Sequence, residues 1–343
     1  MTTNVLICDD SGMARKLMAR ALPDDWDVQV SFAEHGEEAL ASIRKGLGDI
    51  LFLDLNMPVM DGYQTLEQIK NHDLPSMVIV VSGDVQPEAH KRVMSLGAIS
   101  FIKKPTSTEV LTELLGKFGL YPTHEDPIEK TSTSKQVIGL LQVPEVGDIT
   151  TRDFLQEIVN VAMGQAADLL ARLLNVFIKL PIPHVNLLEA SELQMALAQT
   201  EHRDNYSAIC QGFIGSGISG EALLLFSDSS FKEVAKLLDY QGDLDRSEEL
   251  ELLMELASIL IGACTSGIAK QMDITFSQGH PILLGQHNKI NELVSSKGTC
   301  DKQILAIELA YEIENYDIQC DLLLLFTEDS LDSLNTRLSY CMG

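Results

Sequence analysis

The chain has 343 residues, 45% of them hydrophobic, so it is long enough for two or three domains that each bury a core. Its formal net charge of −25 argues against binding nucleic acid, because that function needs clustered Lys and Arg side chains. The six cysteines show no metal-binding spacing, and scattered free thiols are typical of a reducing cytoplasm. The first residues enter a strand pattern directly, without a signal peptide, and the longest apolar runs are too short to span a bilayer. We therefore expect a soluble cytoplasmic protein with no membrane insertion.

The first 120 residues alternate between short β-rich runs and helical patterns. The expected strands are Val5–Cys8, Val28–Val30, Ile50–Leu53, Met77–Val81 and Ile99–Ile102, and the helices that follow them are expected at about 11–22, 36–45, 62–71, 87–96 and 107–118. Near-continuous apolar strands indicate a parallel sheet that is buried on both faces. Five such β-α units predict an α/β doubly wound, flavodoxin-like domain with strand order 2-1-3-4-5, whose site lies at the carboxyl ends of the strands.

Polar residues stand at the ends of four of these strands. Asp9 and Asp10 follow the first strand and Asp54 follows the third, while Ser82 follows the fourth and Lys104 the fifth. Three carboxylates in one crevice repel one another unless a cation lies between them, and oxygen ligands of this kind suit Mg²⁺. Taken singly, the acidic pair could cap a helix and the serine could belong to a turn. Together they predict a magnesium site.

This four-part arrangement resembles the receiver domain of two-component response regulators, the CheY-like family, over about residues 1–120. The resemblance implies that a histidine kinase or a small phosphodonor phosphorylates Asp54. It also implies that the backbone carbonyl of Asn56 completes the metal ligands, and that Ser82 and Lys104 contact the phosphoryl oxygens. Phe101 resembles the aromatic switch residue of the family, although an aromatic side chain on a strand is often only a packing residue.

After a linker at about 121–147, the sequence repeats itself. The helix pattern Asp153–Gly164 recurs as Glu251–Gly262, 98 positions later, and the strand Ala222–Phe226 recurs as Leu322–Phe326, 100 positions later. We therefore expect an α+β domain over 148–343 made of two α-β-β-β-α halves, at about 150–240 and 247–343, related by a pseudo-twofold axis. Alternating strand patterns favour an antiparallel sheet with long helices on one face.

The segment Asp153-x3-Glu157-x2-Asn160, followed by Gly164, resembles the active-site signature of the CheC/CheX/FliY phosphatases. The resemblance covers about residues 148–343 and includes the duplication, which is CheC-like. Residues three apart share one helix face, so Glu157 and Asn160 can be presented together. The family implies that Asn160 orients a water in line with an acyl phosphate and that Glu157 pairs with the lysine of a docked receiver. The substrate would then be a phosphorylated CheY-like receiver.

The second copy departs from this signature. Ser258 stands where the asparagine is expected, while Glu251 and Glu255 remain, so we expect this half to be inactive or a scaffold, because serine lacks the amide. In the first copy, Asp153 can instead form a helix-capping box with Thr150.

We expect a response regulator of a chemotaxis-type system, whose output domain hydrolyses the aspartyl phosphate of a receiver under the control of Asp54. The alternative is a non-catalytic adaptor, switched by phosphorylation, that docks chemotaxis or motor proteins. The kinase, the direction of regulation, a homodimer, and whether the substrate receiver is its own or a separate one are all left open.

Overall fold

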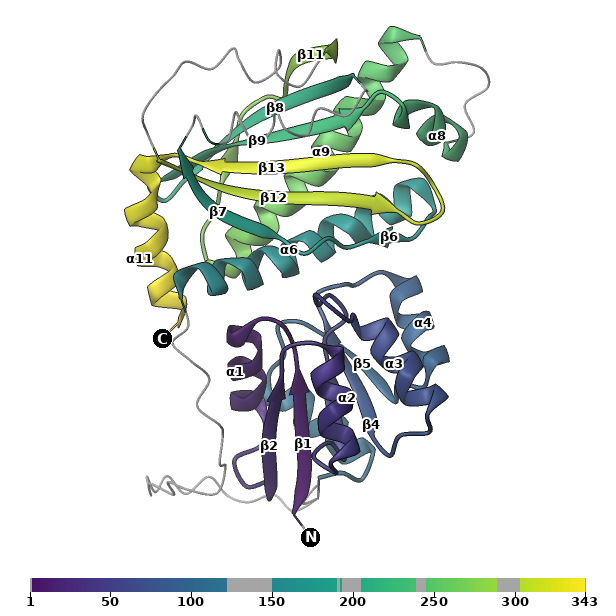
Figure 1. The fold of residues 1–343 in the computed structure, drawn as a ribbon. Helices are drawn as coiled ribbons and strands as arrows, with labels where there is room; N and C mark the ends of the chain where they lie inside the picture. Colours follow the sequence, from purple (N-terminus) through teal and green to yellow (C-terminus); the bar gives the residue numbers. More distant parts are fainter. Residues whose placement is uncertain are drawn as a thin grey trace. The chain divides into compact units, whose positions relative to one another are not determined.

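The computed structural model describes residues 2–121, 150–189, 192, 205–238, 245–288 and 303–342. These residues form two compact units, each built on a β-sheet of its own (Figure 1).

The first unit is a doubly wound α/β domain. Its sheet has five parallel strands in the order β2-β1-β3-β4-β5, which confirms the predicted order. The strands are β1 (Thr3–Cys8), β2 (Val28–Ala33), β3 (Ile50–Leu53), β4 (Met77–Ser82) and β5 (Ser100–Lys103). The helices are α1 (Gly12–Ala21), α2 (Gly36–Arg44), α3 (Gly62–Asn71), α4 (Pro87–Leu96) and α5 (Thr108–Lys117).

Alternate residues of each strand serve two separate cores, one on each face of this sheet. On β1, Val5 and Ile7 pack with residues of α1 and α5, whereas Leu6 and Cys8 pack with residues of α2, α3 and α4. Because both faces are covered by helices, the strand sequences are mostly apolar, and β3 (ILFL) is entirely so. The strand ends are then the places where this sheet presents polar side chains.

The second unit is an α+β domain. Its first half comprises α6 (Thr151–Leu174), β6 (Ile178–Lys179), β7 (His184–Glu189), β8 (Tyr206–Gly215), β9 (Ile218–Ser227) and α8 (Ser230–Leu237). Its second half comprises α9 (Arg246–Gln271), β10 (Ser277–Gln278), β11 (Ile282–Asn288), β12 (Gln303–Ile313), β13 (Gln319–Phe326), the 3-10 helix η1 (Glu328–Ser330) and α11 (Leu331–Met342).

The eight-stranded sheet of this unit is symmetric about the β9–β13 pair. Its order is β10-β8-β9-β13-β12-β6, with β11 also pairing with β8 and β7 also pairing with β12, and the recorded pairs are antiparallel. Each half therefore contributes edge strands to the long strands of the other half. The described residues of each half contain four strands rather than the expected three, because the two-residue strands β6 and β10 are too short to show a pattern in the sequence.

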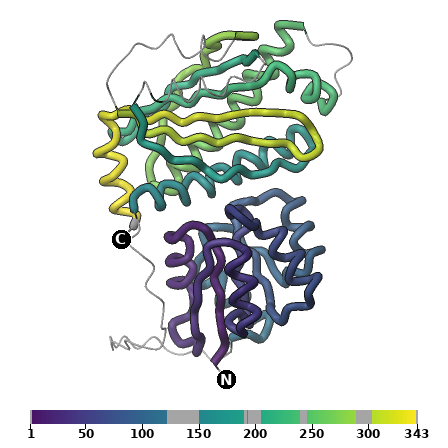
Figure 2. The backbone as a smooth tube through the Cα atoms, viewed as in Figure 1, coloured from purple at the N-terminus to yellow at the C-terminus, as the bar shows by residue number. Residues whose placement is uncertain are grey.

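The two long helices α6 and α9 pack against each other (Figure 1, Figure 2). They approach closely where Gly267 of α9 meets Ala162 of α6, since a Cβ on Gly267 would lie 2.7 Å from the Ala162 Cβ. The α9 thiol of Cys264 and the β12 hydroxyl of Tyr311 lie 3.3 Å apart, which ties this helix to the sheet. Among the described residues, α9 is the one helix long and apolar enough to cross a membrane, and 61% of its most apolar window is buried within the protein.

Candidate functional site

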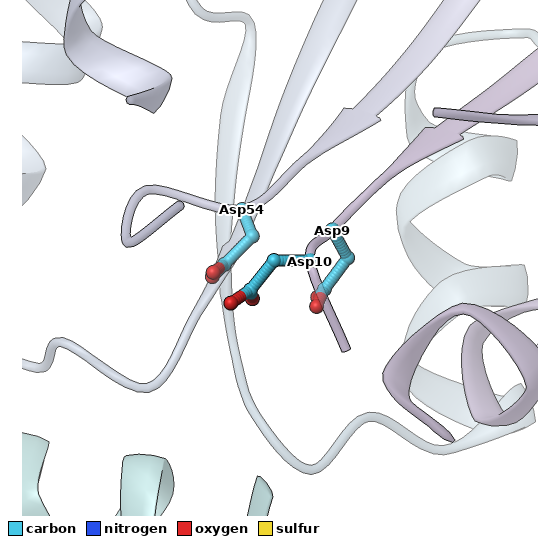
Figure 3. Close-up of side chains that lie close together, drawn as sticks. All are labelled: Asp9, Asp10 and Asp54. Atoms are coloured by element: carbon cyan, nitrogen blue, oxygen red, sulfur yellow. The ribbon is translucent and has the colours of Figure 1, made fainter. Parts of the chain in front are cut away.

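Three carboxylates meet at the carboxyl edge of the first sheet. Asp9 and Asp10 follow β1 and Asp54 follows β3, and one ligand oxygen from each lies within 4.8 Å of the others (Figure 3). The backbone N–H of Asp54 donates to the Cys8 carbonyl at 2.9 Å, which aligns the two strand ends. Neighbouring β1 and β3 are parallel, so their carboxyl ends present these acids side by side. The oxygen-only cluster fits a hard divalent cation such as Mg²⁺.

Lys104 closes this cluster from the end of β5. Its ammonium nitrogen lies 2.7 Å from Asp9 Oδ2 and 3.4 Å from Asp54 Oδ1, and all three side chains are nearly buried. The Lys104 backbone N–H donates to the Ser82 carbonyl at 2.9 Å, so the ends of β4 and β5 are joined. A buried ammonium between carboxylates offsets their mutual repulsion and provides a cation for a further anionic group.

Ser82, Asn56 and Phe101 were also expected in this site. Ser82 is buried at the end of β4, and the Asn56 backbone N–H donates to Asp54 Oδ2 at 3.2 Å. Phe101 is half-buried on β5 with its ring edge-on to that of His90 on α4, at a centroid distance of 5.6 Å. Phe101 therefore has a packing partner on α4, and its expected role as a switch residue stays a prediction.

One residue of this site escaped sequence reasoning. Arg15 on α1 is buried, and its Nη1 donates to the carbonyls of Asp9 at 2.7 Å and Asp10 at 3.3 Å. Its Nη2 lies 2.7 Å from a carboxylate oxygen of Glu34. Arg15 thus fixes the backbone of the acidic pair. The signal that could have pointed to Arg15 is its place between the apolar positions of an amphipathic helix. That pattern more often indicates a charge exposed to solvent.

Buried negative charge also affects a neighbouring thiol. Burial, and secondarily the charges of Asp9 and Asp54, raise the pKa of Cys8 well above its usual value. The Cys8 thiol is therefore protonated at neutral pH and is a core side chain rather than a nucleophile.

In the second unit, the signature residues lie on α6. Thr150 and Asp153 form the capping box that starts this helix, with Asp153 N–H donating to Thr150 Oγ1 at 3.2 Å and Thr150 N–H to Asp153 Oδ2 at 3.0 Å. Asp153 therefore acts as a helix cap, the second of its two expected roles. Glu157 and Asn160 follow within two turns on the same helix and are separated by one turn.

The corresponding positions on α9 carry no amide. Ser258 is exposed, and its hydroxyl donates to the Met254 carbonyl one turn earlier at 2.7 Å, so it is bonded to its own helix. Glu251 and Glu255 are also exposed. The two halves share a fold, but their long helices differ in the chemistry they present.

Residues 5–116 match the model of the response regulator receiver domain family. A protein-glutamate methylesterase/protein-glutamine glutaminase of Bacillus licheniformis is 35% identical over 136 residues, which are 39% of this chain and 36% of that protein. The chain thus spans about a third of the length of this curated relative.

Two solved structures are also similar. The response regulator domain of Thermotoga maritima CheB is 29% identical, covers 35% of this chain and 95% of that chain, and has a TM-score of 0.31. Thermotoga maritima FliY is 16% identical, covers 56% of this chain and 96% of that chain, and has a TM-score of 0.42. From the family match, together with the parallel sheet and the acidic cluster at its carboxyl edge, residues 5–116 form a response regulator receiver domain.

Proposed function

We propose that the receiver domain accepts a phosphoryl group on Asp54, with Mg²⁺ held by the carboxylates of Asp9, Asp10 and Asp54 and by the Asn56 carbonyl. A carboxylate oxygen of Asp54 attacks the phosphorus of a kinase phosphohistidine or of a small phosphodonor. The bond from phosphorus to the donor breaks, and an acyl phosphate forms. The cluster of three carboxylate oxygens within 4.8 Å supports the metal. The 3.4 Å approach of Lys104 Nζ to Asp54 supports its role as the cation that neutralises the transferred group.

We further propose that the second unit hydrolyses the aspartyl phosphate of a phosphorylated receiver. The observation that carries this proposal is the presence of Glu157 and Asn160 one turn apart on α6, in a duplicated α+β unit joined to a receiver. Asn160 holds a water in line with the phosphorus, the water oxygen attacks, and the phosphorus–aspartate bond breaks to give phosphate and the free carboxylate. Glu157 pairs with the lysine of the docked receiver, and this ion pair orients the receiver on α6.

Little covalent chemistry is needed, since hydrolysis of an acyl phosphate depends mainly on positioning and charge. One positioning amide is worth about 10²–10³ in rate, by analogy with oxyanion-hole amides. Asn160→Ala should therefore lose most of the activity, and Glu157→Ala a large part.

The decisive experiment adds the full chain to a separately phosphorylated CheY-like receiver and follows phosphate release. The matched control is Ser258→Ala, which changes the equivalent position on α9 and should leave the rate within about twofold. Equal damage from Ser258→Ala and Asn160→Ala would contradict a single site on α6. A chain that binds the phosphorylated receiver without accelerating phosphate release would instead be the adaptor.

A further inference from the structure

The buried polar residues of α6 form one stripe that extends beyond the signature. The buried polar side chains of this helix are Glu157, Asn160 and Asp168. Asn160 follows Glu157 by three residues, Gly164 follows Asn160 by four, and Asp168 follows Gly164 by four. These spacings place the three polar residues on one face of the helix. Asp168 lies eight residues beyond Asn160, about 12 Å further along the helix axis.

Helix stability does not explain Asp168. Aspartate is a poor residue for a helix interior, and Asp168 is only 8% exposed. Its Oδ2 lies 2.9 Å from Arg172 Nη2, but an ion pair of this spacing on an exposed helix surface stabilises the helix only weakly. Its Oδ1 accepts no hydrogen bond from the part of the chain that the structure describes. Leaving a buried oxygen without a donor costs more than such an ion pair contributes, so Asp168 is a net cost to the fold.

The internal repeat gives an independent comparison. At the offset of 98 positions, Glu157 and Gly164 are matched by Glu255 and Gly262, and Arg172 by the basic Lys270. Asn160 and Asp168, however, are both replaced by serine, at Ser258 and Ser266. The half without the asparagine amide also lacks the aspartate, which is expected if the two residues serve one bound partner.

We propose that Asp168 is a docking residue for the phosphorylated receiver on which α6 acts, and that its carboxylate pairs with a Lys or Arg side chain of that receiver. This inference rests on the proposed phosphatase function. The pair selects receivers that carry a cationic side chain about 12 Å from the phosphoaspartate, because Asn160 and Asp168 are that far apart along α6. Asp168 is too far from the phosphorus to take part in hydrolysis, so its contribution is to binding and specificity.

The test separates binding from chemistry. Full-length Asp168→Ala is compared with the parent for hydrolysis of a separate phosphorylated CheY-like receiver, and for binding of the same receiver carrying beryllofluoride. We expect KM and the Kd for the beryllofluoride form to rise about tenfold, while kcat changes less than twofold. Asp168→Glu should restore most of the binding. Ser266→Ala, the matched change on α9, should have no effect.

Two results would overturn the docking role. One is an equal loss of binding in Arg172→Ala, which would mean that the helix ion pair is what matters. The other is unchanged binding by Asp168→Ala together with a lowered melting temperature, which would make the residue structural. If the parent releases no phosphate, the phosphatase proposal fails, and the binding measurement still decides the role of Asp168.

Discussion

At the scale of single residues, Asp54 is the group on which the receiver chemistry depends. Its carboxylate lies close to those of the acidic pair after β1, and the ammonium of Lys104 is 3.4 Å from its Oδ1. Asp54→Asn should abolish label uptake from a phosphodonor, since the amide cannot act as the nucleophile. Chelation of Mg²⁺ should abolish label uptake by the parent protein. Incorporation of labelled phosphate is the measurement.

The control for this change is Asp73→Asn, at an exposed position with a left-handed backbone that asparagine also tolerates. It should take up label as the parent does. Undiminished, acid-labile labelling of the Asp54→Asn protein would place the phosphoryl group elsewhere.

A second residue, Asp321 on β13, should make the second unit pH-sensitive. Burial, and then the charge of Glu308, raise the pKa of Asp321 from 3.8 to about 6. The folded state therefore holds this proton more tightly than the unfolded state, so the stabilisation is present at low pH and is lost as the pH rises through about 6. Asp321→Asn should increase the free energy of unfolding by about 1–3 kcal/mol above pH 7, and by less at pH 5.

The single tryptophan makes this prediction measurable in the full chain. Trp26 is buried in the receiver, so its fluorescence reports that domain, while far-UV circular dichroism also follows the second unit. Asp321→Asn should shift only the dichroism transition. Asp317→Asn, at an exposed position of the same unit, should shift neither. A gain in stability for Asp321→Asn that is equal at pH 5 and pH 8 would show that its carboxyl titrates normally.

At the scale of elements, the crossing of α6 and α9 depends on a missing side chain. A Cβ on Gly267 would lie 2.7 Å from the Cβ and 2.9 Å from the Cα of Ala162. Gly267→Ala should therefore destabilise the second unit by about 1–3 kcal/mol, because the helices must move apart. Gly262→Ala on the same helix meets nothing within 4 Å and should stabilise by up to about 1 kcal/mol through helix propensity. Thermal unfolding followed by circular dichroism compares the pair, and equal effects would exclude a close crossing.

The elements also show how far sequence reasoning can reach. The strands of the receiver, their order and the gathering of Asp9, Asp10 and Asp54 at one edge were predictable, because each depends on a local apolar run and on the polar residues directly after it. The long helices α6 and α9 were predictable in kind, but both extend beyond the repeated segments. Helix caps such as Thr150 with Asp153 were visible as short motifs.

Other features left no local signal. The pairing of β6 and β7 with β12 joins segments more than a hundred residues apart, and no periodicity reports such pairing. Arg15 was hidden because its role comes from backbone carbonyls, which every residue has. His287 was not singled out, although its ring nitrogens lie 2.8 Å from Asp228 and 3.1 Å from Glu249, because these three residues come from separate elements.

At the scale of the whole molecule, a receiver and a unit proposed to act on receivers share one chain. A partner on the same chain acts at a high effective concentration, so an unregulated unit would compete for its own receiver. We expect phosphorylation of Asp54 to change hydrolysis of an external phosphorylated receiver. Turnover should differ severalfold between the chain with and without beryllofluoride on Asp54, after excess reagent is removed.

The control for this comparison is the Asp54→Asn chain, on which beryllofluoride treatment should have no effect. If the parent turned over the external receiver equally with and without beryllofluoride, and Asn160 were still essential, the phosphatase proposal would stand. Control of the phosphatase by its own receiver would be excluded.

The exchange of edge strands between the two halves has a consequence for how the chain is made. The receiver sheet is complete once residue 103 has left the ribosome, so this domain can fold while the rest is still being synthesised. Among the strands that the structure describes in the second unit, β6 and β7 pair only with β12, which is made later, and β9 lacks one neighbour until β13 ends at Phe326. The first half therefore emerges with unpaired strand edges. The nascent chain is most exposed to misassembly during this interval, when the edges of one half can pair with those of a neighbouring chain.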